Sequence, residues 1–387
     1  MGQQAGGFSF QTRQRDATTA ARTGLIRTPH GEAPTPAFMP VASRGVVKAC
    51  APEEVRAAGI DILCTNAYHL HLRPGEEVVR RHGGIHEMMR WPGPLLSDSG
   101  GYQVFSMNDL RRIGSEGVQF RSYVDGSTEV ITPERSIGIQ RLLGTDLVMA
   151  FDECTPYPCE REYAERSLAL TTEWARRCKA TPLAPGQALL GIVQGSVYQD
   201  LRLRSLRELL EIGFDGYAVG GLAVGESKEE MRAVLASLTP HMPEAQLRYL
   251  MGIGTPADIV ACVRWGMDLF DCAAPTRNAR HGTLYTARGE VHIRNARHRD
   301  SLEPIEFGCD CPTCRNYTAA YVHYLFRAGE PLALRLCTIH NLRFYARLMS
   351  DLRAAIAQGR YQEWAREFLA TQGQPWGEDR STGHWGP

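Results

Sequence analysis

The sequence lacks several features that would set it apart from ordinary globular proteins. No run of about eighteen apolar residues occurs, and the start MGQQAGGFSF lacks the basic-then-apolar pattern of a secretory signal. A net charge is also lacking, because 43 basic residues balance 43 acidic ones. Bulk electrostatics therefore indicate nothing about nucleic-acid binding. We expect a cytoplasmic protein with no membrane segment.

Lysine is scarce too, with three of the 43 basic residues, and we ascribe the excess of arginine to genomic bias. Hydrophobic residues make up 43% and charged residues 22% of the 387, which excludes a disordered or fibrous chain. The eleven cysteines are an odd number, so free thiols and a metal site in a reducing compartment fit better than a disulfide framework.

Short apolar runs rich in β-formers recur along the chain and alternate with helical patterns. Helix starts are indicated by Thr132-Pro133, by the capping box Ser227-x-x-Glu230 and by Thr255-Pro256. Alternating units of this number predict a (β/α)8 TIM barrel, with a doubly wound sheet as the alternative. The eight predicted strands are 37–41, 60–65, 93–98, 146–152, 188–194, 216–221, 248–254 and 268–272.

Other segments interrupt this alternation. Residues 8–38 predict a small N-terminal β-sheet that caps one barrel end, and residues 118–132 predict an inserted β-hairpin about Asp125-Gly126. We expect a catalytic barrel domain over 1–299, a zinc-binding subdomain with closing helices over 300–371, and a flexible Gly/Pro-rich tail over 372–387.

A metal site is indicated by CDCPTC followed by a distant IH. Cys309, Cys311, Cys314 and His340 supply three thiolates and an imidazole, a closed tetrahedral set that suits one structural Zn²⁺ per chain. Four protein ligands leave no position for a reactive water. Cys337 lies three residues before His340 and is an alternative fourth ligand.

Three carboxylates, Asp98, Asp152 and Asp271, lie at the C-terminal ends of predicted barrel strands, where the catalytic groups of such folds gather. Paired carboxylates suit displacement at a sugar anomeric carbon, since one attacks or stabilises the centre while the other moves a proton. Gln194 and the loop GGLAVGE (220–226) could pair with a purine edge, between Tyr102 and Met251.

A basic stretch begins directly after Asp271. Between Arg277 and Arg299 six arginines face one acid, Glu290. Arg277 and Arg280 lie nearest to the candidate nucleophile, which suggests that the anomeric centre belongs to a nucleotide whose phosphates and neighbouring bases must be held.

In combination and order, SDSGGYQ, FDEC, GIVQG, GGLAVGE, YLMGIGTP, FDCxxPTRxxR and CxCxxC with a distant His resemble the tRNA-guanine transglycosylases, over about residues 8 to 370. The resemblance is to bacterial members, which carry no appended RNA-binding domain. It implies that guanine at the wobble position of tRNAs with a GUN anticodon is exchanged for a deazaguanine precursor of queuosine. It also implies a homodimer.

By the same resemblance, Asp271 is the nucleophile that forms a covalent RNA–enzyme intermediate, and Asp98 is the general acid/base. Arg277 and Arg280 hold the flanking uridines. Cys154 and Val224 restrict the space at the base, so 7-aminomethyl-7-deazaguanine is the expected incoming substrate. The implied base-binding residues are Ser99, Tyr102, Asp152, Cys154, Gln194, Gly221, Leu222, Ala223, Val224, Glu226 and Met251.

Two other functions remain as alternatives. A barrel glycoside hydrolase would share the carboxylates, although it has no need of a metal knuckle beside an arginine run. A non-catalytic tRNA-binding subunit would have no need of both Asp98 and Asp271.

Overall fold

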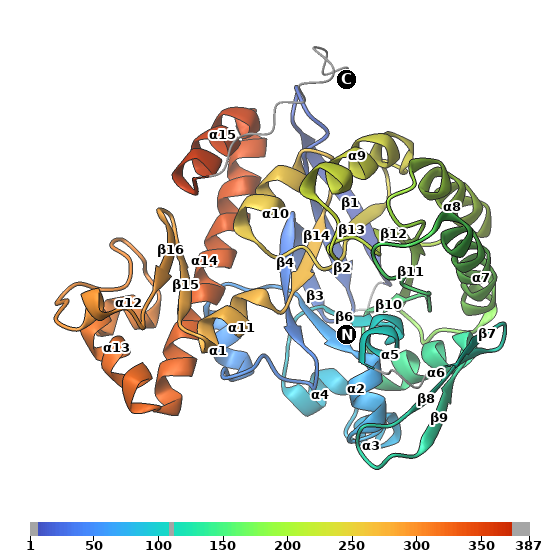
Figure 1. Ribbon diagram of the computed structural model, residues 1–387, viewed down its shortest axis with the longest axis horizontal. Coiled ribbons are helices and arrows are strands. Elements are labelled where there is room, and N and C mark those ends of the chain that lie inside the picture. The colour runs from blue at the N-terminus through green and yellow to red at the C-terminus, as the bar shows by residue number, and fades with distance from the viewer. Residues whose placement is uncertain (1–6, 108–111, 374–387) are drawn as a thin grey trace, which may run out of the picture.

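A closed barrel of parallel strands forms the centre of the computed structural model, which describes residues 7–107 and 112–373 (Figure 1). Every barrel strand has two neighbours, with β14 pairing onto β4 and β6 onto β10. The closure confirms the (β/α)8 barrel and excludes a doubly wound sheet, which would have two free edges. In barrel order the strands are β4 (Ala37–Ala42), β5 (Leu63–Asn66), β6 (Leu95–Asp98), β10 (Leu147–Met149), β11 (Ala188–Val193), β12 (Gly216–Val219), β13 (Leu247–Leu250) and β14 (Leu269–Cys272).

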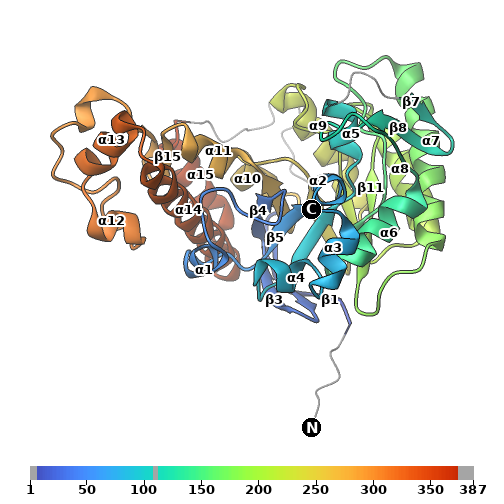
Figure 2. The ribbon, with the colours of Figure 1, turned by 90° about the horizontal axis from the view of Figure 1, so that it is seen from below.

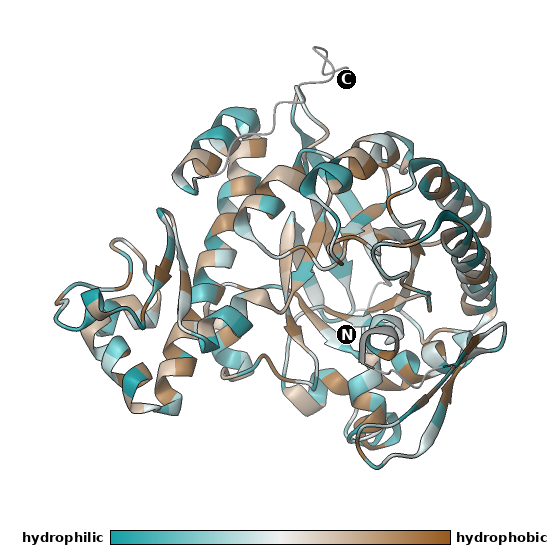
Figure 3. Ribbon diagram, in the orientation of Figure 1, coloured by the Kyte–Doolittle hydropathy of each residue, from teal (hydrophilic) through white to brown (hydrophobic). Residues whose placement is uncertain are grey.

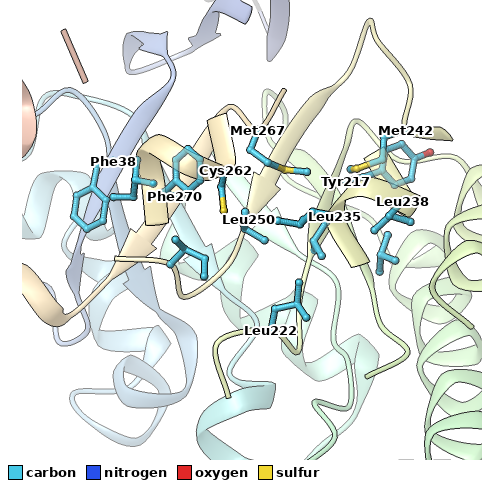
Figure 4. Packing of buried hydrophobic residues seen from close by; sticks show 14 of the residues in the cluster. Phe38, Tyr217, Leu222, Leu235, Leu238, Met242, Leu250, Cys262, Met267 and Phe270 are labelled. Carbon is cyan, nitrogen blue, oxygen red and sulfur yellow. The ribbon is translucent and has the colours of Figure 1, made fainter. Parts of the chain in front are cut away.

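The strands are buried on both sides, because successive side chains point alternately to the barrel interior and to the surrounding helices. Met39, Leu190 and Leu269 belong to the interior cluster. Leu250 and Phe270 belong to the cluster between the strands and the helices, where Figure 4 shows them beside residues of the next layer. Strands that are buried on both sides consist of continuous apolar residues, and these apolar runs are the signal from which the sequence predicts them.

The three predicted helix starts are confirmed, because Thr132, Ser227 and Thr255 cap α6, α9 and α10. Thr132 accepts from the Arg135 amide at the start of α6, and Gly144 ends that helix with φ +74°. Figure 3 shows hydrophilic residues along the outer sides of α7 and α8. The helices are α1 (Pro52–Ala57), α2 (Ala67–Leu72), α3 (Glu76–Arg81), α4 (Ile85–Met89), α5 (Gly101–Met107), α6 (Pro133–Leu143), α7 (Arg161–Ala180), α8 (Gln199–Ile212), α9 (Lys228–Leu238), α10 (Pro256–Val263) and α11 (Ala274–Arg280).

A small antiparallel sheet covers the amino-terminal end of the barrel, as predicted. It consists of β1 (Ser9–Arg15), β2 (Arg22–Thr28) and β3 (Gly31–Thr35), and Ile26 joins the interior cluster. Arg22 is bound to Asp268, the residue before β14, and His30 to Asp146, the residue before β10. The sheet therefore leaves the opposite, carboxyl-terminal end of the barrel for the candidate site.

The predicted hairpin is present as β8 (Gly117–Arg121) and β9 (Thr128–Ile131). A third strand, β7 (Arg112–Gly114), pairs with β8 and extends the hairpin to a three-stranded sheet. The buried side chains of Phe120 and Ile131 anchor this sheet to the main core.

The C-terminal part projects from one side of the barrel (Figure 2). The hairpin β15 (Thr283–Thr286) and β16 (Gly289–His292) is followed by α12 (Pro312–Asn316), α13 (Ala319–Ala328), α14 (Pro331–Ala357) and α15 (Tyr361–Thr371). Helix α14 lies between α13 and the barrel in both views. The division of the chain at residue 299 stays a prediction, and the predicted tail falls mostly on 374–387, outside the described residues. No helix in the described part of the chain is long and apolar enough to span a lipid bilayer.

Candidate active site

The three predicted carboxylates meet at the carboxyl-terminal end of the barrel. Asp98 is the last residue of β6, Asp271 lies near the end of β14, and Asp152 follows β10 by three residues. Parallel strands bring their carboxyl ends to the same side, so residues far apart in sequence become neighbours. The charge of Asp271 raises the pKa of Asp98, and the charge of Asp98 raises that of Asp152, which is the effect of like charges in one site.

Asp271 is held through one of its oxygens. Its Oδ1 accepts from the Tyr249 hydroxyl at 2.6 Å and from the Gly252 amide at 2.8 Å. Burial raises the pKa of Asp271, whereas these two hydrogen bonds act in the opposite direction. Two donors on one oxygen fix the plane of the carboxylate, and the partly exposed side chain keeps its orientation.

Asp98 has the properties of a proton carrier. Its Oδ2 accepts from Asn66 Nδ2 at 3.0 Å, from the last residue of the neighbouring strand β5. The surrounding protein removes water from the carboxylate and raises its pKa to about 6, with a contribution from Asp271. A carboxyl group with a pKa near neutrality can both donate and accept a proton under ordinary conditions.

Asp152 is buried and shares a hydrogen bond with Gln194. Gln194 Nε2 donates to Asp152 Oδ2 at 2.7 Å, and the Ser99 hydroxyl lies 3.5 Å from Oδ1. Burial raises the pKa of Asp152 to about 7. Gln194 Oε1 is buried and has no hydrogen-bond partner among the described residues. The pair therefore offers a flat polar edge with unused hydrogen-bonding capacity, which a heterocyclic ring could satisfy.

The glycine loop after β12 packs directly on Gln194. Gly221 has φ +62°, and a Cβ there would lie 2.4 Å from Gln194 Oε1, so only glycine fits. Gln194 and Gly221, predicted as neighbours around one base, are thus in contact.

Glu226 fixes the rest of this loop. It accepts from the Ala223 amide at 2.5 Å and from the Val224 amide at 3.0 Å. Because a trans peptide holds its C=O opposite its N–H, the Leu222 carbonyl points away from Glu226. The Leu222 side chain lies in the hydrophobic core (Figure 4). Only its backbone is therefore available to a ligand.

The remaining predicted base-binding residues lie around these groups. Tyr102 on α5 is 48% exposed, and burial together with the nearby thiols of Cys154 and Cys272 raises its pKa. Met251 follows β13 and is partly buried, with its sulfur close to Gly220. Cys154 is partly buried on the loop after β10, as is Val224 on the glycine loop.

The predicted arginines lie on α11, which starts three residues after Asp271. Arg277 is exposed, and its carbonyl accepts from His281 Nδ1. Arg280 is partly buried, and its Nη1 has no partner among the described residues. Burial and the charge of Arg277 lower the pKa of Arg280. Both cations therefore lie on the helix that follows the strand of Asp271, and both have free hydrogen-bonding capacity among the described residues.

The four predicted metal ligands converge in one buried cluster, well separated along the chain from the carboxylates. His340 Nδ1 lies 3.7, 3.7 and 3.3 Å from the sulfurs of Cys309, Cys311 and Cys314. Tetrahedral Zn–S and Zn–N bonds of ordinary length would put sulfur and nitrogen about 3.6 Å apart. His340 Nε2 donates to the Tyr285 carbonyl, which leaves Nδ1 as the ligand atom. The cluster can hold a metal ion, and it includes His340 rather than Cys337.

Residues 16–374 match the family described as queuine tRNA-ribosyltransferase. The chain belongs to this family. A queuine tRNA-ribosyltransferase of Thioalkalivibrio sulfidiphilus is 54% identical over 92% of the chain and 96% of the relative. One of Symbiobacterium thermophilum is 51% identical over 92% and 89%, and one of Methylobacillus flagellatus is 53% identical over 90% and 94%. The predicted family is confirmed, as is the prediction of a pentosyltransferase enzyme.

Sequence reasoning did not find three polar residues of this ribosyltransferase site. Asn66 lies at the end of a barrel strand, so the same reasoning that predicted Asp98 could have predicted it. Tyr249 lies inside a strand, so its bond to Asp271 required knowledge of which side it faces. Arg202 occupies the buried side of α8 with Leu206 and Leu209, and an arginine at such a position is itself a signal.

Proposed function

We propose that this ribosyltransferase replaces guanine at the wobble position of tRNAs with a GUN anticodon by 7-aminomethyl-7-deazaguanine, as a step of queuosine formation. The observation that carries the proposal is the difference between two neighbouring carboxylates. Asp271 is oriented by two donors on one oxygen, whereas Asp98 has a pKa of about 6. One is suited to attack and the other to proton transfer.

In the proposed reaction, Asp271 Oδ2 attacks C1′ of the ribose while the bond from C1′ to guanine breaks. Asp98 gives its proton to the departing guanine and becomes a carboxylate. The incoming base then loses its ring N–H proton to Asp98 and attacks C1′, and the ester to Asp271 breaks. Atoms and charges balance without water, so the exchange is complete when both aspartates have returned to their starting states.

Asp152, Gln194 and Gly221 are the proposed partners of the guanine-like edge of both bases. The unsatisfied Gln194 Oε1 and the raised pKa of Asp152 support this assignment. Ser99 would help to hold Asp152, and Tyr102 and Met251 would lie on the ring faces. The guanine leaves the anticodon loop at modest cost, because loop bases are already partly unstacked.

The glycine loop supports an amine-bearing incoming base. The Leu222 carbonyl, turned away from Glu226, is an acceptor for an ammonium group. Glu226 is bound directly behind this loop, and its negative charge favours a cationic substituent over a neutral one. We propose that Cys154, Ala223 and Val224 limit the size of that substituent.

Arg277 and Arg280 are the proposed contacts to the uridines beside the wobble nucleotide. Their position on α11, immediately after the strand that carries Asp271, supports this role. A guanidinium can bind phosphate and base edges with two parallel hydrogen bonds.

We propose that the metal held by Cys309, Cys311, Cys314 and His340 is one structural Zn²⁺. The donor set of three sulfurs and one nitrogen, its burial and its separations fit this ion. When bound, the ion cross-links the loop before α12 to α14. The four side chains satisfy its coordination, so it would take no part in the base exchange.

We further propose a homodimer that uses the surface of the metal-binding segment. Leu302, Phe307 and Tyr324 on this segment are 86%, 75% and 63% exposed. Large apolar side chains that are exposed on one segment are typical of interfaces. Light scattering of the purified protein tests this, and a monomer at micromolar concentration would contradict it.

The exchange itself is tested with unmodified tRNA and radiolabelled guanine. We expect label to enter the RNA, and label incorporation to vanish in Asp271→Asn, which keeps the shape of the side chain but not its charge. Release of sugar from oligosaccharides without incorporation would instead favour the glycoside hydrolase.

The metal is tested by elemental analysis and by chelation. We expect about one zinc per chain, and we expect chelation under denaturing conditions to prevent refolding until zinc is returned. A folded protein with much less than one equivalent of metal would contradict the assignment.

A further inference from the structure

We infer that Arg202 is a positioning residue of the base site, which aims the amide of Gly221 at the purine. This inference rests on the proposed function and names a group that the reaction needs but that touches no substrate. Arg202 lies on α8, behind the two loops that carry Gln194 and Gly221, and its side chain is fully buried.

The guanidinium binds backbone carbonyls of both loops. Arg202 Nε donates to the Ser196 carbonyl at 2.7 Å, and Nη1 donates to those of Val193 at 2.8 Å and Gly220 at 2.6 Å. Nη2 donates to the Gly221 carbonyl at 3.1 Å. One side chain thus joins the two loops that flank the base-binding edge.

The bond to Gly220 decides the direction of the next amide. In a planar trans peptide the N–H of one residue points opposite to the C=O of the residue before it. Because the Gly220 carbonyl points toward Arg202, the Gly221 amide points away from Arg202. A glycine loop is otherwise free to turn its peptides over, and Gly221 has the positive φ that L side chains rarely adopt. Arg202 therefore removes a freedom that would weaken the hydrogen bond to the base.

Arginine is the side chain that can do this. It has five donors in a rigid planar fork, whereas lysine has three on one atom and cannot reach four separated carbonyls. Within the described part of the chain Arg202 forms no ion pair, and its four hydrogen bonds all go to backbone oxygens. Burial lowers its pKa to about 10, which leaves it charged at neutral pH.

Arg248 provides a matched control at the other end of the barrel. It is a buried arginine that also binds backbone carbonyls, through Nη2 to Met242 at 2.5 Å and Nε to Pro243 at 3.3 Å. Burial lowers its pKa to about 10 as well. Its loss should cost stability in the same way, but its side chain is bound to the carbonyls of Met242, Pro243 and Trp265, at the amino-terminal end of β13.

The experiment compares Arg202→Met, Arg202→Lys and Arg248→Met with the wild type. Melting temperatures are measured first, and then the KM values for guanine and for tRNA by label incorporation. We expect both Arg202 variants to raise the KM for guanine about tenfold, the effect of about one lost hydrogen bond, with the KM for tRNA unchanged. The KM for the 7-aminomethyl base should rise by the same factor, because the Gly221 amide contacts the ring that both bases share. Arg248→Met should lower the melting temperature and leave every KM unchanged.

Equal KM values for guanine in the Arg202 and Arg248 variants would overturn the inference, and so would failure of both Arg202 variants to fold while Arg248→Met folds. In either case Arg202 would serve the fold alone. Wild-type protein that incorporates no guanine would contradict the proposed function instead. Calorimetric binding of guanine to the same variants then decides the role of Arg202 independently.

Discussion

Buried aspartates lie at both ends of the barrel, but they are paired with cationic side chains at one end and not at the other. At the amino-terminal end, Asp268 is bound by Arg22 at 2.6 and 2.9 Å, and Asp146 by His30 at 2.7 Å. At the carboxyl-terminal end, Asp98, Asp152 and Asp271 form no ion pair with any described residue. The bonds from His30 and His86 lower the pKa of Asp146 to about 2, whereas burial raises that of Asp152 to about 7.

The difference shows where this fold places stability and where it places chemistry. Paired aspartates at the closed end fasten the N-terminal sheet to the barrel. The histidine bonds lower the pKa of Asp146, whereas burial raises the pKa of Asp268 although Arg22 acts in the opposite direction. Unpaired aspartates at the open end are destabilising in the free protein, because each is kept from water and repels the others. Their unsatisfied state is what makes proton transfer and ligand binding at this end favourable.

The largest expected effect is on the reaction at the open end. Asp98→Asn removes the proposed proton carrier but keeps the size of the side chain, so label incorporation should fall by about 10² to 10⁴. Binding of tRNA, measured by filter retention, should stay within a few-fold of wild type. An unchanged exchange rate would show that Asp98 does not carry the proton.

The next effect is on stability at the closed end. Asp268→Asn leaves Arg22 buried without its charged partner, and we expect the free energy of unfolding in urea to fall by about 3 to 5 kcal/mol. The exchange rate per folded molecule should not change, because Asp268 lies at the opposite end of the strand from Asp271. A large loss of activity without a loss of stability would contradict this division between the ends.

The smallest expected effect is on the free energy of unfolding, which an aspartate-to-asparagine change should raise at the open end and lower at the closed end. Burial raises the pKa of Asp152 from 3.8 to about 7, so the wild type loses stability as the pH rises through this interval. Asp152→Asn should therefore raise the free energy of unfolding by about 1 to 3 kcal/mol at pH 8, and the gain should shrink as the pH falls toward 4. Denaturant titrations at several pH values measure this.

Asp146→Asn is the control for that experiment. The pKa of Asp146 is lowered to about 2, so its stabilisation is present at neutral pH and is lost only as the pH falls through its folded pKa. This variant should be less stable than wild type at pH 8. If Asp146→Asn were more stable than wild type at pH 8, or Asp152→Asn less stable, the proposed difference between the two ends would be wrong.

Much of the fold could be predicted because the signals are local. Each barrel strand is a short apolar run, and capping residues such as Thr132 and Ser227 mark helix starts within one turn. Strand β7 was not predicted, since three residues with one half-buried side chain carry no clear alternation. The aspartates were found because barrel topology assigns strand ends to one face.

The supporting contacts could not be predicted because they join residues distant in sequence. The bond from Asn66 to Asp98 spans 32 positions, and that from Arg202 to the Gly220 carbonyl spans 18. Which side of a strand faces Asp271, and which oxygen of it is held, depends on register and rotamer. The metal ligands were the exception, because the spacing of Cys309, Cys311 and Cys314 is itself local geometry.

Helix α14 links three parts of the enzyme. His340 belongs to the metal cluster, the neighbouring Asn341 donates to the Pro275 carbonyl of α11, and Tyr345 donates to the Gly254 carbonyl in the loop after β13. A displacement of α14 would therefore move both α11, which carries the arginines, and the loop after β13. On the proposed function, loss of the metal ion would therefore impair both the contacts of Arg277 and Arg280 to the anticodon and the attack of Asp271 on the ribose.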